Sequence, residues 1–252
     1  MSINLNFLNR TKQDNGWLAG KKIDRGEKHV IGTRNEMSLH AALKEHYRRP
    51  GDIVEGKIGN YIIDLVQKDR LVEIQTGNFS ALKNKFEELL KKHSIHLVYP
   101  IPKERYLVYV APRTGELLNR RKSPKKGTVY DLFSELIRIP HLICHPRLTI
   151  EAVLISEEEL RCDDGRGSWR RRGVSILDRR LVEVKESSVF AKPADFLAVL
   201  PQDLATPFTN KNLAAAVGIT ASQARKVNYT LKKADLIEEV GKNGNEILHA
   251  IV

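Results

Sequence analysis

The chain has 252 residues, of which 41% are hydrophobic and 29% are charged, and its formal net charge is +11 at pH 7. This length suits one large domain or two to three small ones, and the apolar content is sufficient for a hydrophobic core. The positive charge favours polyanionic partners, chiefly nucleic acid, although a ribosomal surface would fit it equally well. No apolar run approaches the roughly 20 residues of a membrane helix, so we expect no membrane association.

Cysteine usage and the N-terminal segment indicate the cellular compartment. Cys144 and Cys162 are the two cysteines of the chain, and they give no disulfide framework. The first residues lack the positively charged start and continuous apolar core of a secretion signal. We therefore expect a cytoplasmic protein.

Residues 1–110 predict a small α/β domain that follows an irregular basic arm of about 32 residues. A helix is expected at 33–47, because Leu39, Leu43 and Tyr47 recur at four-residue spacing. The later expected elements are a strand at 52–57, a hairpin at 61–76, a helix at 80–92, and strands at 95–99 and 105–110. This order predicts a mixed sheet flanked by helices.

Residues 111–190 predict a basic α+β middle region. Its expected elements are a basic loop at 112–128, a helix at 130–139, strands at 148–155 and 174–184, and a linker at 185–188. The run 157–159 consists of three glutamates and is expected to be solvated. In the loop 161–173, Trp169 precedes Arg170, Arg171 and Arg172, a combination that can stack a base and hold phosphates. A loop with a solvated basic tip is the alternative.

Residues 191–252 predict three helices followed by a hairpin, with Asn243-Gly244 as the turn signal. This pattern resembles the winged helix-turn-helix family, which implies binding to duplex DNA. The polar residues expected on the solvent face of the third helix are Gln223, Arg225, Lys226, Asn228, Thr230 and Lys233. Such donors suit phosphates and the major groove, although many domains of this shape bind proteins instead.

The hairpin at 61–76 carries a carboxylate on each strand. If residues 68–69 form a two-residue loop, Asp64 lies directly opposite Glu73. Directly opposed side chains have Cβ atoms about 4.5–5.5 Å apart, a distance at which two buried carboxylates repel each other. A divalent cation between them would remove the repulsion. The alternative is a pair of solvated acids on an open sheet face.

Residues 33–110 resemble the PD-(D/E)XK, or restriction-endonuclease-like, nuclease superfamily. The matching positions are Glu36 for the acid of the first helix, Asp64 for the hairpin acid, and Glu73-Ile74-Gln75 for the E-x-K strand. The resemblance implies a DNA-cleaving hydrolase with Mg²⁺ (or Mn²⁺) held by Asp64, Glu73 and Glu36. Many nucleases of this class act as dimers, so a homodimer is one expected assembly.

The sequence departs from that family at Gln75, where a lysine is usual. A neutral amide can position water but supplies no charge to a phosphate. Lys57, Lys83 and Lys85 are the candidates for a replacement, and the sequence does not choose among them. The competing interpretations are a catalytically inactive nuclease-fold protein that binds DNA, as a regulator or recruitment factor, and a protein that binds or processes RNA.

Overall fold

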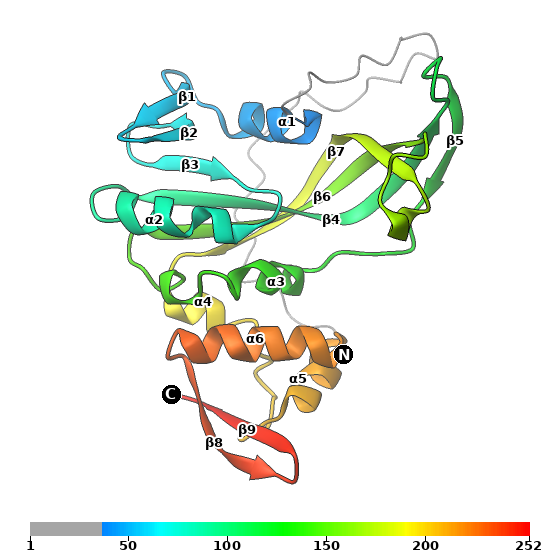
Figure 1. Ribbon diagram of the computed structural model, residues 1–252. Helices are drawn as coiled ribbons and strands as arrows, with labels where there is room; N and C mark the ends of the chain where they lie inside the picture. The colour runs from blue at the N-terminus through cyan, green and yellow to red at the C-terminus, as the bar shows by residue number, and fades with distance from the viewer. Residues whose placement is uncertain (1–36) are drawn as a thin grey trace.

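The computed structural model describes residues 37–252. Its strands are β1 (Ile53–Ile58), β2 (Tyr61–Val66), β3 (Leu71–Ile74), β4 (Ile95–Val110), β5 (Leu117–Lys122), β6 (Leu148–Asp163) and β7 (Val174–Phe190), followed by a separate C-terminal hairpin. The first seven form one mixed sheet in the order β1-β2-β3-β4-β6-β7, with β5 paired to β4 (Figure 1). β3, β4 and β6 run parallel, and the other neighbours are antiparallel. The predicted mixed α/β architecture is confirmed.

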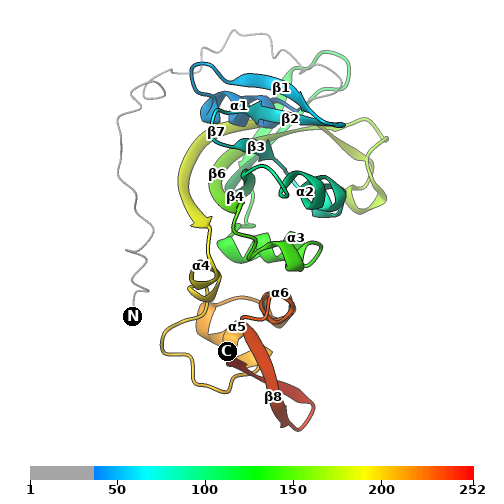
Figure 2. The same cartoon turned by 90° about the vertical axis from the view of Figure 1, so that its left-hand side faces the viewer.

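Helices cover both faces of this sheet (Figure 2). They are α1 (Ser38–Tyr47), α2 (Lys83–Leu89) and α3 (Phe133–Leu136). Leu39 and Leu43 of α1 pack with Val98 of the sheet, whereas Phe86 and Phe133 belong to a second, larger core cluster under α2 and α3. Within residues 37–252, no helix is long and apolar enough to cross a membrane.

The first turn of α1 is held by a residue far away in the sequence. Asp178 of β7 accepts hydrogen bonds from the backbone amide of Ser38 at 3.0 Å and from its hydroxyl at 2.6 Å. A carboxylate at this place satisfies amides that have no partner inside the helix and interacts favourably with the helix dipole. The first residues of the helix expected at 33–47 lie outside the described residues.

β4 corrects the prediction of two separate strands, because it continues through Pro100 and Pro102 with a register shift at 102–104. On one side β4 pairs with β6 along its length. On its other side β3 pairs only with residues 95–98 and β5 only with residues 106–110, so no described strand pairs with the stretch between them. Proline lacks an amide hydrogen and is tolerated where a strand edge has no neighbour.

The middle region also differs from its prediction. The basic loop contains β5, and residues 185–188 belong to β7 instead of a linker. The expected boundary at residue 110 does not separate two sheets, because β5, β6 and β7 extend the sheet that begins with β1. Glu157 and Glu159, expected to be solvated, are each 1% exposed, because they lie in β6 between β4 and β7.

The C-terminal segment is a small helical unit with a hairpin. Its elements are α4 (Pro193–Leu197), α5 (Asn210–Val217), α6 (Ala221–Lys233), β8 (Ile237–Asn243) and β9 (Glu246–Ile251). Thr209 and Thr220 cap α5 and α6 through reciprocal capping boxes. Gly218 ends α5 with φ +69°, a conformation that favours glycine. The three predicted helices and terminal hairpin are confirmed, although the first helix is shorter than expected.

Candidate functional site

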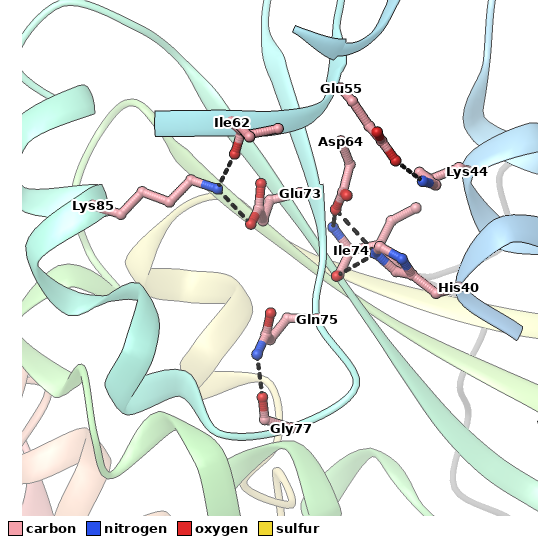
Figure 3. A network of polar contacts seen from close by, with 10 residues as sticks. All are labelled: His40, Lys44, Glu55, Ile62, Asp64, Glu73, Ile74, Gln75, Gly77 and Lys85. Carbon is pink, nitrogen blue, oxygen red and sulfur yellow. Dashed lines mark hydrogen bonds and ion pairs between the residues drawn. The ribbon is translucent and has the colours of Figure 1, made fainter. Parts of the chain in front are cut away.

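The β2–β3 hairpin has the register that the sequence predicts. Leu65 pairs with Val72, so the chain turns at residues 68–69. Continuing this register by one position along each strand places Asp64 opposite Glu73. The two carboxylates therefore enter the same region of the molecule from neighbouring strands (Figure 3).

Asp64 is held in its ionised form by two donors. Its Oδ2 accepts a hydrogen bond from the amide of Ile74 at 2.7 Å and lies 3.2 Å from Nε2 of His40. Burial raises the pKa of Asp64, but the contacts with His40 and Ile74 outweigh it and hold the pKa below its usual value. The same His40 nitrogen lies 3.1 Å from the carbonyl oxygen of Ile74. His40 is therefore a hydrogen-bonded histidine that links Asp64 to the backbone of β3.

Glu73 has the opposite electrostatic character. It is 9% exposed, and burial followed by the negative charge of Asp64 raises its pKa above the usual value. Its Oε1 accepts a hydrogen bond from Nζ of Lys85 at 2.6 Å, which partly offsets that increase. Its Oε2 is buried and has no hydrogen-bond partner among the described residues. A buried carboxylate oxygen without a partner is costly, so this atom is suited to receive a cation or a donor.

Among the candidate lysines, Lys85 is the one that reaches Glu73. It comes from the first turn of α2, and its ammonium group also donates to the carbonyl oxygen of Ile62 at 2.7 Å. Lys57 and Lys83 are exposed and contact neither carboxylate in the part of the chain that the structure describes. A positive charge therefore reaches Glu73 from α2.

Gln75 takes another role from the one expected. Its side-chain amide donates to the carbonyl oxygen of Gly77, and its backbone amide donates to Val98 (Figure 3). It lines a cavity of about 250 Å³ together with His40 and Ile74. Gln75 thus ties the end of β3 to the following turn while remaining at the edge of the site.

The donor set fits a hard divalent cation. Asp64 and Glu73 offer carboxylate oxygens, and Ile74, the residue after Glu73, offers a backbone carbonyl. Oxygen ligands of this kind are the ones that Mg²⁺ prefers. Within residues 37–252, no group of three or more His, Cys, Asp or Glu side chains is arranged as a metal site. Glu36, the expected third acid, lies outside the described residues.

The predicted DNA-binding face of α6 is only partly exposed. Gln223 donates to Asp131 at 3.1 Å, and Lys226 donates to Ser134 at 3.0 Å, so both residues face the sheet domain. Asn228 and Thr230, also expected to be exposed, are 1% and 0% exposed. Arg225 and Lys233 remain on the surface, beside the half-exposed ring of Tyr229. The expectation of a fully solvated face is wrong because α6 packs against α3 and its preceding turn.

The arginine-rich loop between β6 and β7 is exposed as expected. Trp169 is 82% exposed, and the guanidinium carbon of Arg170 lies 5.5 Å from the centroid of its ring. Arg171 donates to the carbonyl oxygen of Val174, and Arg172 adopts a left-handed conformation with φ +52°. The loop therefore has a fixed turn that presents an aromatic ring and arginines at the far end of the long strands (Figure 1).

Residues 37–191 match the family described as "Domain of unknown function (DUF8091)". The chain belongs to this family. An uncharacterized protein of Treponema pallidum (strain Nichols) is 32% identical over 186 residues, which are 73% of this chain and 74% of that protein. No solved structure matches the chain. The family segment contains the whole seven-stranded sheet and ends before α4.

Proposed function

We propose that this protein is a metal-dependent nuclease that hydrolyses DNA phosphodiester bonds. The observation that carries the proposal is the pairing of Lys85 with Glu73 beside Asp64. Two carboxylates and an ammonium group on adjacent elements are the charges that the resemblance to PD-(D/E)XK nucleases implies. The order of elements agrees with the resemblance, since α1, the hairpin with Asp64, the strand with Glu73, α2 and β4 follow one another.

Asp64, Glu73 and the carbonyl oxygen of Ile74 would hold Mg²⁺. A bound Mg²⁺ supplies charge for the scissile phosphate and lowers the pKa of a bound water. Lys85 opposes the increase in the pKa of Glu73 and presents an ammonium group to the developing negative charge, the role that Gln75 does not fill. His40 orients Asp64 through its ring nitrogen.

A DNA target is supported by the C-terminal unit. Two capped helices followed by a hairpin have the order of elements of a winged helix-turn-helix, and the chain as a whole carries a net charge of +11. Arg225, Lys233 and most of the β8–β9 hairpin are accessible to a duplex while α6 packs against α3. The homodimer expected from the resemblance stays a prediction.

Cleavage of supercoiled plasmid DNA with and without Mg²⁺ tests this function. We expect Asp64→Ala, Glu73→Ala and Lys85→Ala to abolish nicking or linearisation while DNA binding persists. Lys83→Ala is the matched control, because Lys83 lies in the same helix turn but is exposed. Cleavage by the Asp64→Ala or Glu73→Ala protein at the rate of the parent would refute the assignment.

An inactive DNA-binding protein with this fold is the second candidate, and the glutamine at position 75 favours it. Isothermal titration of the parent protein with Mn²⁺ distinguishes the two. A nuclease binds the metal through Asp64 and Glu73, so heat should be released by the parent and lost in the Asp64→Ala variant. An inactive relative would give the same flat titration for both proteins.

A further inference from the structure

Two cavities adjoin at the open end of β3. The smaller, about 250 Å³, contains Gln75 and His40 of the candidate catalytic site. The larger, about 310 Å³, extends along residues 99–105 of β4 towards residues 123–127. Leu39, Thr76 and Arg179 line both cavities. A ligand chain that leaves the catalytic site past Gln75 therefore enters the larger cavity directly.

The floor of the larger cavity consists of Arg105, Arg179 and Glu157, and both arginines are paired with buried glutamates. Nε of Arg105 lies 2.6 Å from Oε1 of Glu157, and Nε of Arg179 lies 3.2 Å from Oε2 of Glu159. Arg161 at 2.7 Å and Arg105 at 3.7 Å bring the number of arginines paired with Glu159 to three. Both glutamate side chains are 1% exposed, while Arg105 and Arg179 are 25% and 33% exposed. The buried acids thus hold the guanidinium groups of two arginines that line the cavity.

A loop brings a further cation over this floor. Ser123 donates its amide to the carbonyl oxygen of Arg105, and Gly127 donates to that of Pro102, so both ends of the loop are tied to β4. A Cβ atom at Gly127 would lie 2.6 Å from a methyl carbon of Ile101 and 2.7 Å from the carbonyl oxygen of Pro102. Only glycine allows so close an approach, and the approach places Lys125 on the cavity wall.

The cavity has an excess of positive charge. Its lining cations are Arg105, Arg179 and Lys125, and its lining acids are Glu157 and Asp131. Glu157 is already paired with Arg105. Asp131 is engaged as well, because it accepts hydrogen bonds from the amide of Thr128 and from Gln223. Arg179 bonds only through Nε among the described residues, which leaves the terminal nitrogens of its fork for an anionic ligand.

We infer that the cavity lined by Arg105, Lys125 and Arg179 is a phosphate-binding subsite for the nucleic-acid strand that passes Gln75. This inference rests on the proposed function, because that function identifies the strand as nucleic acid. Binding at the subsite requires neither the metal nor cleavage. Arginine forks held by buried acids are already oriented before the strand arrives, so little side-chain entropy is lost on binding.

Binding of a fluorescently labelled single-stranded oligonucleotide and of its duplex is measured by anisotropy in EDTA at several salt concentrations. Lys125→Ala is the principal variant, because Lys125 is exposed and its replacement should not destabilise the fold. Lys126→Ala is the matched control, since Lys126 is an exposed neighbour outside the cavity lining. Arg179→Met tests whether the cavity floor binds the oligonucleotide. Its thermal melting curve shows whether the variant is still folded.

We expect Lys125→Ala and Arg179→Met to weaken binding and to reduce the slope of log K against log salt by about 0.7 to 0.9, the value of one lost phosphate contact. Lys126→Ala should leave that slope unchanged. Equal effects of Lys125→Ala and Lys126→Ala would overturn the subsite, even if the parent cleaves DNA. The parent could also fail to cleave DNA while Lys125→Ala, but not Lys126→Ala, weakens binding. That result would support the subsite and contradict the nuclease.

Discussion

Replacement of Lys85 by methionine tests the buried pair that carries the proposed function. Lys85 and Glu73 side chains are 13% and 11% exposed, and their charged atoms are 2.6 Å apart. Breaking a buried pair by removing one partner costs about 3–5 kcal/mol when the remaining charge is fully buried. Glu73 can escape part of this cost by binding a proton, so we expect a loss of about 2–3 kcal/mol at pH 8.

The sign of the pH dependence follows from the pKa of Glu73. Burial and Asp64 already raise this pKa, and removal of the Lys85 ammonium group raises it further. A carboxyl group with a raised pKa in the folded state destabilises the fold as the pH rises through that pKa. The difference between the parent and Lys85→Met should therefore shrink to under about 1 kcal/mol at pH 5.

Urea denaturation at pH 5 and pH 8 measures these differences. A double-mutant cycle with Glu73→Gln isolates the pair, and Lys83→Met is the control for loss of a lysine from α2. We expect a coupling free energy above about 1 kcal/mol at pH 8. A coupling below about 0.5 kcal/mol, or an equal loss at both pH values, would refute the buried pair.

Three further changes probe contacts around the site. His40→Ala should raise the pKa of Asp64, which carboxylate NMR would detect; an unchanged titration would contradict the His40 contact. Asp178→Asn should cost about 1 kcal/mol of unfolding free energy through the start of α1, and a melting temperature equal to that of the parent would argue against the cap. Gly127→Ala should cost about 1–3 kcal/mol by overpacking against Ile101; a neutral result would show that the loop can move away.

The register of the hairpin could be predicted because it depends on local features. A polar two-residue turn between apolar runs fixes which residues face each other, and so Asp64 and Glu73 could be paired from the sequence. The choice of Lys85 over Lys83 could not be made in the same way. It depends on where α2 lies against the sheet, and that position is set by the core cluster that Phe86 shares with Phe133 and Leu136, which are far from the hairpin in sequence.

The burial of charged side chains was the main feature that could not be predicted from the sequence. The glutamates at 157 and 159 have the composition of a solvated run, but arginines on three different strands neutralise them within the sheet. The prediction that the polar face of α6 is exposed to solvent was wrong for a similar reason. Polar side chains such as Gln223 and Lys226 are typical of a solvated face, and only the docking of α6 on α3 shows that they bond to another part of the protein.

The central claim is that Asp64 and Glu73 share a divalent cation, and a crystal structure with Mn²⁺ tests it most directly. We predict an anomalous peak within bonding distance of both carboxylates and the carbonyl oxygen of Ile74, with Lys85 still beside Glu73. The same crystal of the Asp64→Ala protein should lose the peak. A parent crystal without density between the two carboxylates, or with manganese bound only elsewhere, would contradict the claim.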